Sequence, residues 1–322
     1  MENKEYSIFI LGYPVEKPEQ ISSCFSMLTY GLTEGFKKLS NVKIVTADVI
    51  KNYNPLNKYF SATLPEYELT KIPQVDFIIA INYCAFFNRP GTVDILRTKC
   101  KKVVSFLECP AIADFCFVLK HTYDKIPIEN QYLLSPIYLP EFTHNIPKEP
   151  KSILLDHLCL VWMNDKAKEW SRNIWEWLEE IKDEYKLYCL VDADTAYADK
   201  GNPHEVQMKY LPKYITPIFA TNYVEYMQKT EKMENFIVTH MGSYNFSVID
   251  MISRGIRVLS PYKFVPKVNE HLFSLPNFKN KAELLSIIKT PINKEYYNLN
   301  INKCVSIDIV AQQMNEVFQK WI

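Results

Sequence analysis

The stretch that decides the fold is FIVTHMGSYNFSVIDMISRGIRVLSPYK, residues 236–263. Residues 236–238 are an apolar run short enough for a buried parallel strand, and the polar residues 239–247 follow where such a strand delivers its ligand loop. Apolar positions within 248–252 have the spacing of one buried helix face, and 256–260 form a second short apolar strand. The segment therefore predicts one compact βαβ unit of an open parallel sheet.

The helix inside this unit has recognisable ends and a start suited to anions. Ser247 is the predicted N-cap, and Gly255 is the residue predicted to end the helix. Backbone N–H groups at a helix start can hold a diphosphate without a metal, and Gly242 lets the backbone approach it. Asp250, expected in the first turn, can accept both hydroxyls of a ribose. Short hydrogen-bonding side chains around the phosphates are expected from Ser243, Asn245 and Ser247. An ordinary βα unit with a polar loop is the alternative interpretation.

This segment resembles the donor-site motif of glycosyltransferases with the two-domain GT-B fold, in which a His-x-Gly-Ser loop precedes a helix with an acid, a Gly turn and a strand. Two positions differ: Asp250 stands where the family usually has Glu, and Arg257 where it usually has Pro. The matching residues are His240, Gly242, Ser243, Asp250 and Gly255. The resemblance implies an enzyme that moves a hexose from a nucleotide sugar, with UDP as the expected nucleotide, to an acceptor hydroxyl. It implies no cofactor beyond the nucleotide-sugar co-substrate, and no metal.

Composition sets the size and the cellular setting of the protein. The chain has 322 residues, of which 48% are hydrophobic, enough for two ordinary cores. A formal net charge of zero removes the electrostatic footprint expected when duplex nucleic acid is the main partner. No apolar run approaches the ~20 residues of a membrane span, and the polar, acidic start is unlike a signal peptide, so we expect a cytoplasmic protein. The eight cysteines show no CxxC spacing and are predicted to be mostly buried free thiols.

Two regions of strand and helix patterns are separated by a Pro- and Lys-containing stretch at 145–151. We expect residues 1–146 to form an N-terminal Rossmann-like, acceptor-side domain and 147–304 a C-terminal Rossmann-like nucleotide-sugar domain. The helix at 305–322 is expected to pack back on the first domain. The predicted fold class is α/β, with two doubly wound domains facing across a cleft as in GT-B enzymes.

Individual elements follow from apolar runs and helical spacing. The predicted strands are 6–11, 42–46, 76–82, 102–107, 152–155, 187–191 and 216–220, with helices at 21–39, 93–100, 165–186 and 222–229. In the helix 165–186, Trp170, Ile174 and Trp177 lie along one apolar face, and Trp175 is predicted to fall off it.

The acceptor side should supply the catalytic base from the end of a first-domain strand. Glu108 follows the strand 102–107 and is the candidate base, with a helix cap or a lysine partner as the alternative. Gly12 and Tyr13 follow the first strand, where the backbone can approach a phosphate or acceptor; a plain turn is equally compatible. His157, after Asp156, occupies a place where GT-B enzymes often contact the donor phosphate. His240 can reach the diphosphate or the sugar, or act as a structural hydrogen-bond partner.

A second, sparser resemblance concerns the segments 75–96 and 101–110. They are similar to part of the DNA β-glucosyltransferases of T-even bacteriophages, which have an Asn-x-x-x-Phe-Phe turn and a later strand ending at an acid that serves as base. The matching positions are Asn82, Phe86, Phe87, Pro90 and Glu108. The acceptor thus stays open between a glycan, a small molecule and a hydroxymethylated base in DNA. A non-hydrolysing sugar-nucleotide epimerase and a non-catalytic nucleotide-sugar binding protein are the other functions compatible with this scaffold.

Two further features are interpreted as structural. Asp192-Ala-Asp194 has the form of a DxD metal motif, but it lies in the second domain without a second nucleotide-binding signature and is expected to be a surface loop. Arg254 and Arg257 flank Gly255; both are predicted to be solvated, and a contact of either one with a phosphate is the alternative.

Overall fold

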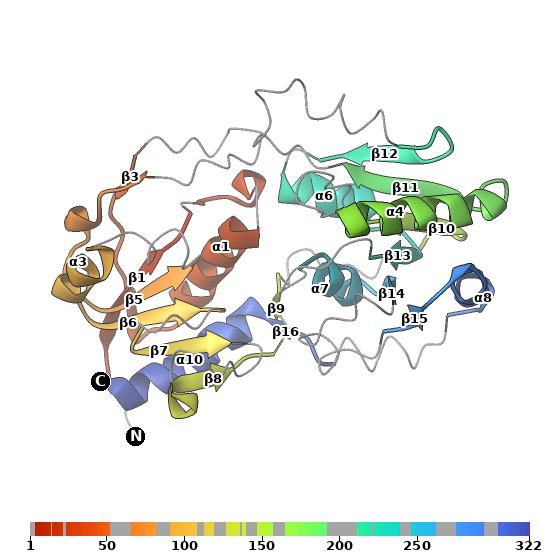
Figure 1. The fold of residues 1–322 in the computed structure, drawn as a ribbon. Coiled ribbons are helices and arrows are strands. Elements are labelled where there is room, and N and C mark those ends of the chain that lie inside the picture. Colours follow the sequence, from red (N-terminus) through yellow and green to blue (C-terminus); the bar gives the residue numbers. More distant parts are fainter. Residues whose placement is uncertain are drawn as a thin grey trace. The chain divides into compact units, whose positions relative to one another are not determined.

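A computed structural model describes residues 4–13, 15–21, 24–51, 66–81, 91–107, 113–118, 127–135, 137–139, 147–156, 165–191, 211–220, 222–238, 246–261, 275–292 and 302–322. The chain forms two compact units, shown as ribbons in Figure 1. It passes from the first unit to the second between Leu139 and Pro140 and returns at Val305. The predicted boundaries lie after residues 146 and 304. The C-terminal segment Val305–Ile322 therefore belongs to the first unit.

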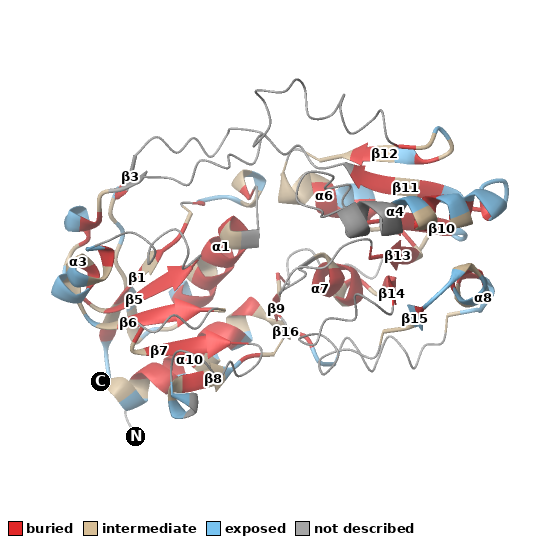
Figure 2. Cartoon of the chain, viewed as in Figure 1, coloured by how far each residue is buried: buried red, intermediate tan, exposed pale blue. Residues whose placement is uncertain are grey.

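The first unit is built on a six-stranded parallel sheet with the order β2-β1-β5-β6-β7-β8. Its strands are β1 (Tyr6–Leu11), β2 (Val42–Ile44), β5 (Val75–Ile81), β6 (Cys100–Phe106), β7 (Phe115–Val118) and β8 (Gln131–Leu133). Strand β5 is a near-continuous apolar run and β6 is buried over its second half, as expected for central strands that are covered on both faces (Figure 2). The order changes direction between β1 and β5, so ligands are expected at the carboxyl ends of these two strands.

Helix α1 (Cys24–Lys37) and the C-terminal helix α10 (Ile307–Trp321) pack closely against each other in this unit. A Cβ atom at Gly35 would lie 2.9 Å from the Ala311 Cβ, and one at Gly31 would lie 2.9 Å from Ile307 Cγ1. Two glycines one turn apart thus let the two helices approach. The first unit also contains α3 (Thr92–Lys99) and the antiparallel pair of β3 (Ile50–Lys51) and β4 (Glu66–Tyr67).

Aromatic side chains of α10 complete the core of the first unit. The Phe318 ring stacks on Phe77 of β5 at a centroid distance of 4.5 Å, and Trp321 stacks on Phe115 of β7 at 4.9 Å. The helix begins at Ile307, two residues later than predicted. Val305–Ser306 instead form the short strand β16, which pairs in parallel with β9 (Ile137–Tyr138). The prediction that the terminal helix returns to the first domain is confirmed.

The second unit has a six-stranded parallel sheet with the order β12-β11-β10-β13-β14-β15. Numbered within the unit, this is the 3-2-1-4-5-6 order of dinucleotide-binding Rossmann folds. The strands are β10 (Ser152–Leu155), β11 (Lys186–Val191), β12 (Thr216–Phe219), β13 (Asn235–Ile237), β14 (Arg257–Pro261) and β15 (Asn277–Phe278). Its helices are α4 (Asp165–Leu178), α6 (Tyr223–Thr230), α7 (Phe246–Ser253) and α8 (Lys281–Lys289). The predicted α/β class with two Rossmann-like units is confirmed.

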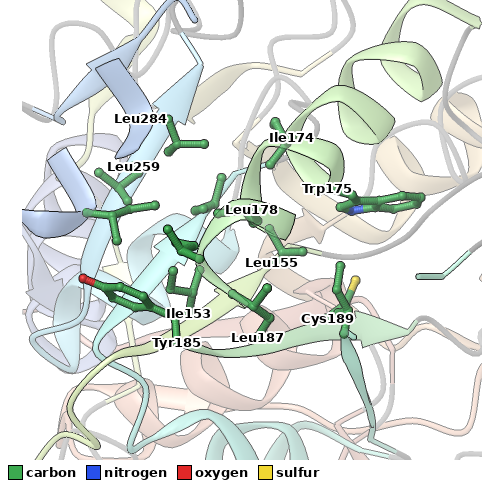
Figure 3. Packing of buried hydrophobic residues seen from close by; sticks show 14 of the residues in the cluster. Ile153, Leu155, Ile174, Trp175, Leu178, Tyr185, Leu187, Cys189, Leu259 and Leu284 are labelled. Carbon is green, nitrogen blue, oxygen red and sulfur yellow. The ribbon is translucent and has the colours of Figure 1, made fainter. Parts of the chain in front are cut away.

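One apolar cluster fills the space between this sheet, α4 and α8 (Figure 3). Ile174 and Leu178 of α4 are completely buried in it, and Trp175 is 4% exposed. The prediction that Trp175 falls off the buried face is wrong. Helix α4 also stops earlier than predicted, at Leu178, and a 3-10 turn, Glu179–Ile181, carries the chain toward β11. Tyr214 fixes this helix end, because its hydroxyl donates to the Trp175 carbonyl at 2.8 Å.

Two other expectations concern cysteines and membrane spans. Among the described residues, Cys100, Cys116, Cys189 and Cys304 are free thiols, and all but the half-buried Cys100 are buried. In the same part of the chain, no helix combines the length and the apolar character that a bilayer crossing requires.

Candidate functional site

The second sheet changes direction between β10 and β13, and the carboxyl ends of these strands meet the start of α7. Asp156 directly follows β10; its backbone N–H donates to the Ile237 carbonyl of β13 at 2.9 Å, and its side chain is 1% exposed. Helix α7 leads from β13 to the adjacent parallel strand β14, so it starts at this same carboxyl edge. This is the position at which open α/β sheets bind their ligands.

Helix α7 begins and ends close to where the sequence predicts. It starts at Phe246, so Ser247 lies in the first turn and the prediction that it is the N-cap is wrong. Gly255 ends the helix with a φ of 70°, and its N–H donates to the Ile252 carbonyl at 2.9 Å. That left-handed conformation strongly favours glycine, which confirms the predicted C-terminal signal.

Asp250 lies in the protein interior and is 3% exposed. Its Oδ1 accepts a hydrogen bond of 2.7 Å from the Tyr223 hydroxyl of α6. Burial raises the pKa of the Asp250 carboxyl to about 6, while the Arg254 charge and the Tyr223 hydrogen bond oppose that rise. The carboxylate is therefore mostly ionised at neutral pH although it is buried. The sequence analysis places an acid at this position, but it does not foresee that a tyrosine holds it.

Two tyrosines one turn apart on α6 reach the two α7 residues that the sequence analysis selects. Tyr223 donates a hydrogen bond to Asp250, and the Tyr226 hydroxyl lies near the side chain of Ser247. Their rings lie 5.8 Å apart between centroids, tilted by 41°. Asp156 lies near enough to raise the pKa of Tyr226 further, in addition to the effect of burial. Sequence reasoning missed both tyrosines; the signal available was their i, i+3 spacing in a helix that begins after the N-cap Asn222.

Arg254 is buried beneath this cluster, which corrects the prediction that it is solvated. It is 4% exposed, and its Nε donates to the Asp250 backbone carbonyl at 3.0 Å. Its Nη1 donates to the Met227 carbonyl at 3.1 Å and to Thr230 Oγ1 at 2.8 Å. A buried guanidinium needs several acceptors, and here the end of α6 provides them. Arg254 thus ties α7 to α6.

Arg257 is also buried, at 5% exposure, so the prediction that it is solvated is wrong. Its Nε donates to Asn235 Oδ1 at 2.7 Å, and its Nη atoms donate to the carbonyls of Thr290 at 2.7 Å and Ile288 at 3.0 Å. These carbonyls lie at the C-terminal end of α8, where a positive charge is favourable. Arg257 therefore caps the C-terminal end of α8.

In the first unit, Gly12 and Tyr13 follow β1 at the edge where that sheet changes direction. A Cβ atom at Gly12 would lie 2.3 Å from Thr29 Oγ1 of α1, which explains why the position needs glycine. The Tyr13 N–H donates to the same Oγ1 at 3.2 Å, and the Tyr13 ring stacks on Phe25 at 6.3 Å. The close backbone approach predicted here is thus an approach to α1, and a ligand contact of either residue stays a prediction.

The remaining predicted site residues lie outside the residues that the structure describes. They are Glu108, His157, His240, Gly242, Ser243 and Asn245. The positions that resemble phage DNA glucosyltransferases and the Asp192–Asp194 pair lie outside them as well, so these predictions stay as they are. Within the described ranges, no group of three or more His, Cys, Asp or Glu side chains is arranged to hold a metal ion.

No protein-family model matches the chain, and no curated protein matches it by sequence. Solved structures do match it over nearly its whole length. HepE of Anabaena in complex with UDP-glucose has a TM-score of 0.60 at 10% identity, over 98% of this chain and 100% of that one. AviGT4, a glycosyltransferase involved in avilamycin A biosynthesis, has a TM-score of 0.57 at 10% identity, over 98% of both chains. The chain has the GT-B fold.

The same fold appears in a structure with UDP bound. MnaA of S. aureus with UDP has a TM-score of 0.54 at 12% identity, over 98% of this chain and 95% of that one. At such identities the likeness concerns the fold, and the function must be argued from the residues.

Proposed function

We propose that this protein is a glycosyltransferase that moves a hexose from a nucleotide sugar, with UDP as the expected nucleotide, to an acceptor hydroxyl. The observation that supports this most directly is the 3-2-1-4-5-6 strand order of the second sheet. The order changes direction between β10 and β13, and α7 starts at the same edge of the sheet. GT-B structures similar to this chain include one with UDP-glucose and one with UDP bound.

The proposed donor site uses the backbone at the start of α7 for the diphosphate. Peptide N–H groups and the helix dipole favour negative charge there, and the segment from Gly242 to Ser247 precedes and opens the helix. Asp250 is the proposed ribose contact. A buried carboxylate with a strongly perturbed pKa, next to the ligand-binding edge of a sheet, is the kind of group that marks functional sites.

The proposed reaction needs a base for the acceptor. Glu108 would take the proton of the acceptor hydroxyl, the hydroxyl oxygen would form the new bond to the anomeric carbon, and the bond from that carbon to the diphosphate would break. The diphosphate would leave with the bonding electron pair and be stabilised at the α7 start. Gly12, Tyr13, His157 and His240 are proposed as additional donor contacts.

Two pairs of variants test this assignment. Asp250→Asn should weaken donor binding in calorimetry by about ten- to a hundredfold, because a neutral amide is a poorer acceptor for two hydroxyls. Glu108→Gln should keep donor affinity and lower turnover, measured as nucleotide diphosphate release, by about a hundredfold or more. The controls are the exposed acids Asp183 and Glu129, changed to Asn and Gln. A wild-type protein that binds no UDP, GDP or TDP sugar would contradict the proposal.

A non-hydrolysing epimerase is the second candidate. One observation favours it: the UDP-GlcNAc 2-epimerase of Methanocaldococcus jannaschii shares the fold with a TM-score of 0.52 at 11% identity, over 96% of this chain and 99% of that one. An epimerase converts the nucleotide sugar without any acceptor. NMR spectra of UDP sugars incubated with the protein alone separate the two reactions, because only the epimerase yields a new sugar nucleotide.

A further inference from the structure

The hydrogen bond between Tyr223 and Asp250 has a role beyond packing. We propose that Tyr223 is a positioning residue whose hydroxyl holds the Asp250 carboxylate in one orientation, ready to accept the ribose hydroxyls of the donor. This inference rests on the proposed function, and it assigns to α6 a part in the specificity of the donor site.

The hydrogen bond from Tyr223 can fix the plane of the Asp250 carboxylate. The Tyr223 hydroxyl lies 2.7 Å from Asp250 Oδ1. Rotation of a carboxylate about its terminal bond is broad and roughly two-fold, so a fixed plane requires a hydrogen-bond donor. An ionised carboxylate can accept about four hydrogen bonds, and one bond from Tyr223 leaves capacity for two hydroxyls of a ligand. A tyrosine suits this task because its rigid ring brings a neutral donor without pairing the charge.

The neighbouring Arg254 does not orient the Asp250 carboxylate by a hydrogen bond. Arg254, which directly follows α7, is a buried cation close to Asp250, but its guanidinium donates to the Asp250 backbone carbonyl and to the end of α6. Its charge stabilises the ionised carboxylate through space. Among the described residues, the hydrogen bond to the carboxylate itself therefore comes from Tyr223.

Among the described residues, the charged and titratable groups that interact with Asp250 or its neighbours come from three segments. Tyr223 and Tyr226 lie on α6, Arg254 follows α7, and Cys304 lies before β16. Burial, strengthened by the Asp250 charge, raises the pKa of the Cys304 thiol to about 12, and burial raises the pKa of both tyrosines. Arginine stays charged at every pH considered. Near neutral pH, Asp250 is therefore the member of this group that changes its charge.

This arrangement predicts how donor binding depends on pH. The ionised carboxylate accepts hydrogen bonds from the ribose hydroxyls more strongly than the protonated group does, so binding should weaken as the pH falls through about 6. The Tyr223 hydroxyl favours the charged form, and its removal should raise the pKa of Asp250 further. The midpoint of the pH dependence of binding should then move to higher pH. A purely structural role for Tyr223 predicts no such movement.

Calorimetric titration of UDP between about pH 5 and 8.5 tests the proposal on wild type, Tyr223→Phe, Tyr214→Phe and Asp250→Asn. Tyr214 is the matched control, since its hydroxyl also makes one hydrogen bond of 2.8 Å within the same unit, to a backbone carbonyl. We expect the midpoint of Tyr223→Phe to rise, with UDP bound about tenfold more weakly near pH 6.5. Tyr214→Phe should keep the wild-type midpoint, and Asp250→Asn should bind weakly without this pH dependence.

Three outcomes would overturn the inference, and they differ from one another. An unchanged midpoint in Tyr223→Phe would leave the donor site in place and reject the positioning role. Equal loss of affinity at all pH values in both tyrosine variants would assign Tyr223 to packing. Wild-type protein without affinity for UDP at any pH would reject the proposed function itself, and this inference with it. Thermal unfolding of each variant, followed by circular dichroism, verifies that the folded protein is being compared.

Discussion

A buried, ionised carboxylate is a costly residue for a fold to keep, and Asp250 is such a residue. Its pKa is raised from 3.8 to about 6 by burial. Between these two pH values the folded protein binds more protons at this site than the unfolded chain does, so stability falls as the pH rises from about 4 to about 6. Above about pH 6 the folded protein bears the full free-energy cost of the buried, ionised carboxylate. A packing role alone would be served better by a neutral side chain.

Replacement of Asp250 by Asn should therefore make the protein more stable while it weakens donor binding. The amide oxygen can still accept the Tyr223 hydrogen bond, and no buried charge remains. At pH 7 we expect a gain of up to about 3 kcal/mol in the unfolding free energy of the second unit, shrinking toward about pH 4. Urea unfolding followed by tryptophan fluorescence at several pH values measures this, with Asp183→Asn as the control. A variant that loses stability at pH 7 would show that the charge is structurally required.

At the scale of elements, Arg257 links β14 to β13 and to the end of α8 through three hydrogen bonds. Arg257 reaches Asn235 on β13 and the carbonyls of Ile288 and Thr290 at the end of α8. Replacement by Met would keep most of the apolar volume but leave these carbonyls without the charged donor. We expect a loss of roughly 3 kcal/mol or more in unfolding free energy, with nucleotide binding kept in the folded protein.

The control for this prediction is the exposed Arg172 of α4, changed to Met, which should alter stability by less than about 0.5 kcal/mol. Urea unfolding of both variants compares them directly. If the unfolding free energy of Arg257→Met equals that of Arg172→Met, the prediction is wrong, because water then replaces the hydrogen bonds of Arg257 to the α8 carbonyls without loss of stability.

The elements that the sequence predicts well are those decided by local signals. The apolar runs of β5, β10 and β14 and the glycine that ends α7 are readable because buried parallel strands and left-handed turns restrict residue type within a few positions. Short strands such as β7, β8 and β15 are not predicted, because so few residues carry little periodicity and their place depends on the finished sheet. Helix α8 is not predicted either, although Leu284, Leu285 and Ile288 have the spacing of one buried helix face.

The site is harder to read from the sequence because its contacts join distant residues. Arg254 and Arg257 look solvated until their carbonyl partners at the ends of α6 and α8 are known. Trp175 is buried because it packs into the apolar cluster that the second sheet forms with α4 and α8. Tyr223 was missed for the same reason, since its partner Asp250 follows much later in the chain.

At the scale of the whole molecule, the chain builds two Rossmann-like units and completes the first one last. It leaves the first unit after β9 and returns at β16, and these two strands pair in parallel. Helix α10 then packs against α1 and inserts Phe318 among the aromatic side chains of the sheet. The first unit is therefore complete only when the C-terminal segment has been added.

The central claim is that the carboxyl edge of the second sheet binds the nucleotide diphosphate of a donor. A crystal structure of the protein soaked with UDP tests it most directly. The account predicts density for the diphosphate at the start of α7, between the ends of β10 and β13, with the ribose hydroxyls within hydrogen-bonding distance of Asp250. Density for UDP in the first unit, or at the second sheet's edge with the ribose turned away from Asp250, would contradict it.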